Sequence, residues 1–99
     1  MSHFSIAGLQ LSLSAGDNLS RLAREIAKTK ERFPWIDMIV LSELAAFGPE
    51  KKYAKSMPGI TEEFFCQIAK NNNVWLIPGS LYEQSQEKIY NTTPIINPE

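Results

Sequence analysis

The stretch DMIVLSE, residues 37–43, decides the fold of this chain. Met38–Leu41 is a short apolar run without polar alternation, which is typical of a strand buried on both faces of a parallel sheet. Ser42 and Glu43 end the run abruptly. In open α/β sheets, ligands bind at the carboxyl ends of the strands. The stretch therefore predicts a covered sheet with a functional group, the Glu43 carboxylate, at its edge.

Glu43 is the residue most suited to chemistry. Its apolar neighbours Leu41, Leu44 and Phe47 predict a partly desolvated carboxylate, and desolvation disfavours the charged form of an acid. Such a group suits general acid–base catalysis. The competing interpretation, on position alone, is a solvated glutamate at the end of a strand.

Upstream of this stretch, the pattern predicts one strand and one helix. The strand covers Phe4–Leu13, with apolar residues on both faces. Asp17 or Asn18 is suited to cap the helix that follows, because either side chain can accept a hydrogen bond from a free helix N–H. Apolar residues recur at helical spacing across residues 19–33, and Pro34 ends the helix.

Downstream, a second helix and two further strands are expected, with turns between them. Thr61 is suited to cap the second helix, which ends at Asn71–Asn73. The other expected elements are a short surface helix at Glu50–Ser56, a strand at Val74–Ile77, a turn at Tyr82–Glu87 and a fourth strand at Ile89–Ile96 that contains Pro94. The order strand–helix–strand–helix–strand–strand (β-α-β-α-β-β) predicts an α/β fold with a mainly parallel sheet.

The length allows one small domain or part of a larger one, and the composition argues against several functions. The chain has 99 residues, of which 43% are hydrophobic and 21% charged, so neither disorder nor a fibrous repeat is expected. A net charge of −1 provides no electrostatic basis for binding nucleic acid or an acidic membrane. No apolar run approaches the ~18 residues of a membrane span. Neither metal-ligand spacing nor a phosphate loop occurs, so no metal and no cofactor is predicted.

The other reactive residues are not placed for catalysis. Cys66 is the only cysteine, which excludes an internal disulfide and a multi-cysteine zinc site and favours a cytoplasmic location. It lies mid-helix, so a buried or half-buried, inert thiol is expected. His3 is expected to be a spectator near the terminus. Trp35 and Trp75 are expected in the core or at its rim rather than in a stacking platform for nucleic acid.

Several segments of the chain have the order and spacing of motifs in one known family. They are SIAGLQL (residues 5–11), DMIVLSEL (37–44), WLIPGS (75–80), YNT (90–92) and NPE (97–99). In this order they resemble the N-terminal part of the carbon–nitrogen hydrolase (nitrilase) superfamily. Within the resemblance, Glu43 occupies the position of the family's catalytic glutamate.

The resemblance implies a fold and an activity. The family fold is a four-layer α-β-β-α sandwich, of which residues 1–99 are expected to form the N-terminal fragment of a single domain. Family catalysis resembles a Glu–Lys–Cys arrangement that cleaves a small-molecule amide or nitrile, which implies that Glu43 is the general base and acid. The family's lysine and cysteine lie downstream of its Pro-acidic turn, so neither Cys66 nor Lys88 is expected to take those roles. Family members are commonly homo-oligomers, which implies the same for the parent protein.

Two departures and one alternative accompany the resemblance. Ser42 stands where the family often has proline, and Pro94 lies in a strand that usually holds small or β-branched residues, so pairing there is expected to be disturbed. The alternative function is a small non-catalytic α/β binding or assembly module. If the chain is a fragment of a hydrolase, the isolated chain is expected to expose an apolar sheet face and a free edge near Ile89–Ile96.

Overall fold

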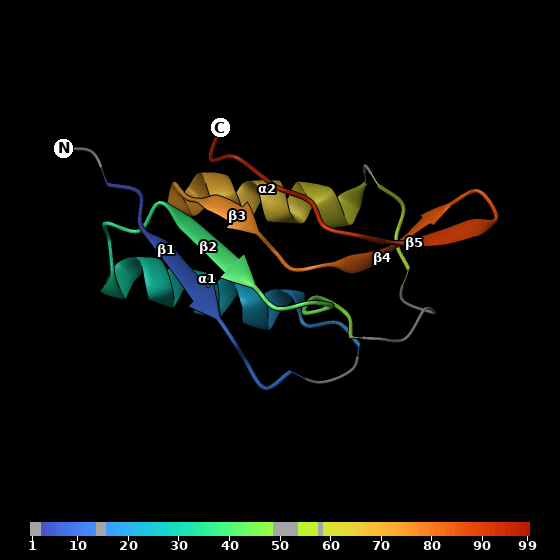
Figure 1. The fold of residues 1–99 in the computed structure, drawn as a ribbon, viewed down its shortest axis with the longest axis horizontal. Helices are drawn as coiled ribbons and strands as arrows, with labels where there is room; N and C mark the ends of the chain where they lie inside the picture. Colours follow the sequence, from blue (N-terminus) through green and yellow to red (C-terminus); the bar gives the residue numbers. More distant parts are fainter. Residues whose placement is uncertain (1–2, 14–15, 49–53, 58) are drawn as a thin grey trace.

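Three parallel strands and two helices form the main body of the structure (Figure 1). The computed structural model describes residues 3–13, 16–48, 54–57 and 59–99. The elements in chain order are β1 (Ile6–Leu9), α1 (Leu19–Arg32), β2 (Met38–Leu41), α2 (Ile60–Asn72), β3 (Trp75–Ile77), β4 (Leu81–Ser85) and β5 (Lys88–Thr92). The α/β class is confirmed, although the chain forms one strand more than the β-α-β-α-β-β order expected.

The strand β2 lies at the centre of the main sheet, whose strand order is β1-β2-β3. Its bounds are those expected from the apolar run. The first strand is shorter than expected, because it ends at Leu9 rather than at Leu13. Leu9 is aligned with Leu41, the last residue of β2, so residues 10–13 have no strand beside them to pair with. Leu11 and Leu13 pack against the core without strand pairing.

Both helices pack on one face of this sheet. In Figure 1 they lie behind the strands, and they contact each other. Leu22 and Ile26 of α1 are fully buried, as are Phe65 of α2 and Ile39 of β2, and they belong to one hydrophobic core. The amphipathic stripe predicted for the first helix is therefore confirmed, because α1 turns its apolar positions toward the sheet.

The opposite face of the sheet is open among the residues that the structure describes. Parallel register places Ile6, Met38 and Trp75 side by side on this face, and the side chains of Ile6 and Trp75 are 61% and 39% exposed. The burial of both faces expected from the apolar patterns is wrong for the described part of the chain, whereas the exposed apolar sheet face agrees with the expectation for a fragment. Trp35 also lies at the surface, edge-on to Phe33 with ring centroids 5.6 Å apart.

The last two strands form an antiparallel hairpin at one end of the molecule (Figure 1). A turn was expected at Tyr82–Glu87, but β4 occupies most of this range and only Gln86 and Glu87 form the turn. Lys55 makes a bridge with Glu83 of β4, so it belongs to an extended segment rather than to the surface helix expected at 50–56. Residues 50–53 of that expected helix lie outside the described residues.

The fourth strand expected at Ile89–Ile96 is divided into two parts. The strand β5 ends at Thr92, and Ile96 then pairs with Leu76 of β3 through two backbone hydrogen bonds of 2.8 and 2.9 Å. Pro94, which has no N–H to donate, lies between the two parts. The disturbed pairing expected at this proline is therefore confirmed.

The ends of α2 differ in how well they were predicted. Its N-cap is Gly59, and no side chain caps the helix N-terminus by a hydrogen bond. The expected cap at Thr61 is therefore wrong. Asn73 ends the helix with a φ of 51°, in the left-handed conformation that asparagine tolerates well.

Of the helices described, neither is long and apolar enough to cross a membrane.

Candidate functional site

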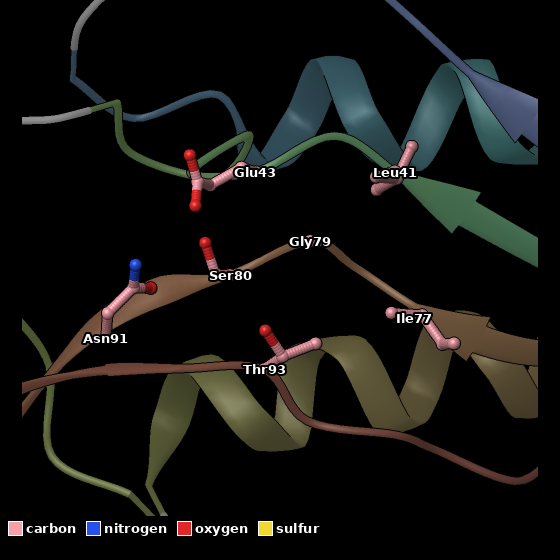
Figure 2. A pocket seen from close by; sticks show the side chains of 7 residues that line it. All are labelled: Leu41, Glu43, Ile77, Gly79, Ser80, Asn91 and Thr93. Carbon is pink, nitrogen blue, oxygen red and sulfur yellow. The ribbon is translucent and has the colours of Figure 1, made fainter.

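The carboxyl ends of β2 and β3 open on a cavity of about 290 Å³ (Figure 2). Leu41 and Ile77, the last residues of these two strands, form its apolar part. Four polar side chains surround the opening: Glu43, Ser80, Asn91 and Thr93. The cavity therefore lies where parallel α/β sheets place their ligands, at the end of the central strand.

Glu43 lies two residues beyond the end of β2 and faces this cavity. Figure 2 shows its carboxylate on one side of the opening, with the Ser80 hydroxyl and the Asn91 amide nitrogen directed toward it from the other side. The residue is exposed, so the partly desolvated environment expected from the sequence is not present in this chain. In its exposure Glu43 matches the competing interpretation of a solvated strand-end glutamate, and in its position it lines the cavity.

The turn after Glu43 has an unusual backbone conformation. Leu44 has a φ of 55°, in the left-handed region that costs a residue with a Cβ about 1–2 kcal/mol. The backbone N–H of Leu44 donates a 3.0 Å hydrogen bond to Oγ of Ser80, 36 residues further along the chain. This bond gives a buried hydroxyl a partner and stabilises the turn, because Ser80 is only 6% exposed.

Gly79 allows the connection between β3 and β4 to pass close to this turn. Its φ is 80°, a conformation that glycine adopts without strain. A Cβ at this position would lie 1.9 Å from the carbonyl oxygen of Ser42. Only a residue without a side chain fits here, so the backbone of the β3–β4 connection lies directly against the residue that precedes Glu43.

Asn18 holds the same turn from the side of α1. Its backbone N–H donates to the carbonyl of Ala46 at 2.9 Å, and its Nδ2 donates to the carbonyl of Ala45 at 3.1 Å. The side chain therefore does not cap the helix. Asp17 takes part of that role, since its Oδ1 accepts a 2.9 Å hydrogen bond from the N–H of Leu19.

Cys66 lies away from this site, on α2. Its thiol is exposed, so the buried or half-buried position expected from the sequence is wrong. Partial burial of the sulfur, followed by the nearby charges of Glu62 and Glu63, raises the pKa of Cys66. A raised pKa leaves less of the reactive thiolate at neutral pH. Cys66 therefore lacks the features of a catalytic nucleophile.

Among the described residues that line the cavity, Glu43 is accompanied by hydroxyl and amide side chains. The described lining contains no cysteine, lysine or histidine, and the lysine nearest in sequence to its wall, Lys88, is exposed in β5. His3 is exposed near the N-terminus. Within the ranges that the structure describes, no group of three or more His, Cys, Asp or Glu side chains could hold a metal ion.

The sequence patterns did not predict that Ser80, Gly79 and Asn18 contact the turn beside Glu43. Ser80 and Gly79 contact the turn from the next strand connection, and Asn18 contacts it from the start of α1. The sequence signals at this point were the Pro-Gly turn at Gly79 and the WLIPGS motif of residues 75–80, which contains Gly79 and Ser80. The contact partners are 27–37 residues apart along the chain, so local patterns carry no information about them.

Comparisons with known proteins match this chain over nearly its whole length. The carbon–nitrogen hydrolase family profile matches residues 5–99. The chain is 32% identical over 105 residues to omega-amidase NIT2 of Mus musculus and 32% identical over 108 residues to omega-amidase NIT2 of Danio rerio. All of this chain is covered in both, but it spans only 37% of the length of these relatives.

A solved structure has the same arrangement of elements. The crystal structure of Nit3 from Saccharomyces cerevisiae, described as a member of branch 10 of the nitrilase superfamily, superposes with a TM-score of 0.83 at 26% sequence identity. The superposition covers 96% of this chain and 40% of the yeast chain.

Proposed function

The chain belongs to the carbon–nitrogen hydrolase family, and from this premise we propose that it provides the general base of a hydrolase that cleaves a non-peptide carbon–nitrogen bond. Its fold is the N-terminal part of the family's α-β-β-α sandwich. The observation that carries the proposal is the position of Glu43, whose carboxylate faces a cavity at the carboxyl end of the central parallel strand.

The proposed reaction needs groups beyond those of this chain. Glu43 takes the proton of a cysteine thiol, and the thiolate attacks the carbon of an amide. Glu43 then returns the proton to the leaving amine, so that ammonia departs from a primary amide and a thioester is formed. Water later hydrolyses this thioester to the acid and the free thiol. A lysine stabilises the oxyanion. We place this lysine and this cysteine in polypeptide that follows residue 99 in the complete protein, because the chain spans about 37% of its relatives' length.

The substrate class that we propose is a small molecule with a terminal amide. The support is the name of the relatives, which are omega-amidases. Asn91 and Thr93 at the rim of the cavity offer hydrogen-bond donors and acceptors to such a group. The role of Glu43 requires its desolvation. We propose that the same polypeptide that provides the lysine and the cysteine covers the open side of the cavity.

The test is the variant Glu43→Gln in the complete gene product that contains residues 1–99. Ammonia release from succinamate, a short acid that ends in a primary amide, is the measurement. We expect a loss of about 10²–10⁴-fold in kcat, the usual contribution of a general acid–base. The matched control is Glu87→Gln at the tip of the β4–β5 hairpin, which should keep full activity. Retained activity of Glu43→Gln with intact folding would remove the role proposed for Glu43.

The exposed sheet face supports a second candidate function, a non-catalytic binding or assembly module. The open sheet face with Ile6 and Trp75 would suit a small binding or assembly module that uses this surface for a protein partner. A lack of amide and nitrile hydrolysis in the complete gene product, together with a stable complex formed through this face, would favour it.

A further inference from the structure

We propose that Ser80 is a positioning residue for Glu43, acting through the backbone of Leu44, with Gly79 as its counterpart on the other side of the glutamate. The inference rests on the proposed role of Glu43 as general base. In this proposal, the Ser80 hydroxyl keeps the backbone beside Glu43 in place.

Within the described part of the chain, no side chain holds the carboxylate of Glu43. Among the residues that the structure describes, none makes a hydrogen bond or an ion pair with this carboxylate. Its location over the cavity is therefore set by the backbone of residues 42–44. A general base must be held within a fraction of an ångström of its productive position, since small displacements cost large factors in rate.

Two contacts from consecutive residues fix this backbone on either side of Glu43. Ser80 Oγ accepts the 3.0 Å hydrogen bond from the N–H of Leu44, the residue after the glutamate. Gly79 lies against the carbonyl oxygen of Ser42, the residue before it, with no room for a Cβ between them. Figure 2 shows Gly79 and Ser80 on the segment that faces Glu43 across the opening.

The conformation of Leu44 explains why the hydrogen bond matters. A φ of 55° is unfavourable for leucine, so the turn needs an external contact to remain in this conformation. Ser80 is buried, and its hydroxyl is held at the start of β4. Without the hydroxyl, the Leu44 N–H loses its partner, and only Asn18 and the turn's own backbone hydrogen bonds hold this segment. We therefore expect the φ of Leu44 to relax in part and to move Glu43 relative to the cavity.

The experiment compares Ser80→Ala, Ser80→Thr and the control Ser85→Ala, an exposed serine at the other end of β4. All are made in the complete gene product. Two quantities are measured: the hydrogen-exchange rate of the Leu44 amide, and kcat and KM for ammonia release from succinamate. For Ser80→Ala we expect Leu44 exchange to accelerate and kcat to fall, each about tenfold, with KM changed less than about twofold. Ser80→Thr, which keeps the hydroxyl, should restore both quantities in part, and Ser85→Ala should change neither.

The outcomes separate this inference from the proposed function. If Glu43→Gln is inactive but Ser80→Ala keeps the native kcat or the native Leu44 exchange rate, the positioning role is overturned and the role of Glu43 stands. A rise in KM at constant kcat would instead identify Ser80 as a substrate contact and would also overturn the inference. If Glu43→Gln is fully active, the proposed function fails, whatever the exchange rate of Leu44.

Discussion

Asn18 and Ala45 are joined by a hydrogen bond that connects the start of α1 to the turn after Glu43. Nδ2 of Asn18 donates to the carbonyl of Ala45 at 3.1 Å, and Asn18 is only 4% exposed. The first helix and the candidate site therefore form one structural unit. A buried amide that satisfies a backbone carbonyl across 27 residues contributes to folding as well as to the geometry of the turn.

Replacement of Asn18 by alanine should destabilise the protein. The carbonyl of Ala45 then loses a buried partner, and the expected loss is about 1–3 kcal/mol in the free energy of unfolding. The measurement is chemical denaturation followed by circular dichroism. The matched control is Asn71→Ala on α2. The exposed Asn71 side chain accepts a hydrogen bond from the exposed Gln67, and its loss should cost less than about 0.5 kcal/mol. Equal losses for the two variants would contradict the role of Asn18.

Gly79→Ala should be among the most damaging small substitutions in this chain. The added Cβ would lie 1.9 Å from the carbonyl oxygen of Ser42, and the φ of 80° is itself unfavourable for alanine. We expect a loss of at least about 2 kcal/mol in unfolding free energy. Gly8→Ala is the control, because a Cβ at Gly8 would meet no atom within 4 Å. A neutral Gly79→Ala would show that the two segments are not in close contact.

The thiol of Cys66 should react slowly and in a pH-dependent manner. Because its pKa is raised by partial burial and then by Glu62 and Glu63, the thiolate forms at higher pH than in an unfolded chain. Alkylation by iodoacetamide, measured from pH 7 to 10, should therefore follow a curve displaced to higher pH relative to the urea-unfolded protein.

Removing one of the two charges tests the electrostatic part of this shift. Glu62→Gln should displace the alkylation curve back toward lower pH, whereas Glu31→Gln on α1 should leave it unchanged. If native and unfolded protein gave the same curve, the raised pKa of Cys66 would be refuted.

The polypeptide of residues 1–99 by itself should bind a hydrophobic dye and self-associate. The cause is the open sheet face, where Ile6 and Trp75 are 61% and 39% exposed. The double variant Ile6→Thr, Trp75→Gln should lower dye fluorescence and aggregate size in light scattering. Ile60→Thr is the control, since Ile60 is 86% exposed at the start of α2 and lies outside this face. A clean native monomer that excludes dye would contradict this expectation.

Local patterns predicted the strand β2 and the helix α1 at the places where the structure has them. The apolar run of β2 is too short for a helix, and the apolar residues of α1 recur at helical spacing. The strand β4 was not predicted, because Tyr82, Glu83 and Gln84 are only half-buried and show no strong apolar alternation. Its pairing with β5 makes it a strand, and pairing is not visible in one segment alone.

Some features of the candidate site were predicted from the sequence, and others are visible only in the structure. The sequence alone determined that an acidic residue closely follows the apolar run of β2 and, through the order of its motifs, indicated the family to which the chain belongs. Only the tertiary structure decided that Glu43 faces a cavity, that it is exposed there, and that Ser80, Gly79 and Asn18 hold the turn beside it. The physical reason is that patterns of neighbouring residues are sufficient for elements such as α1 and β2, whereas hydrogen bonds and close contacts between residues 27–37 positions apart exist only once the sheet has brought its strand ends together.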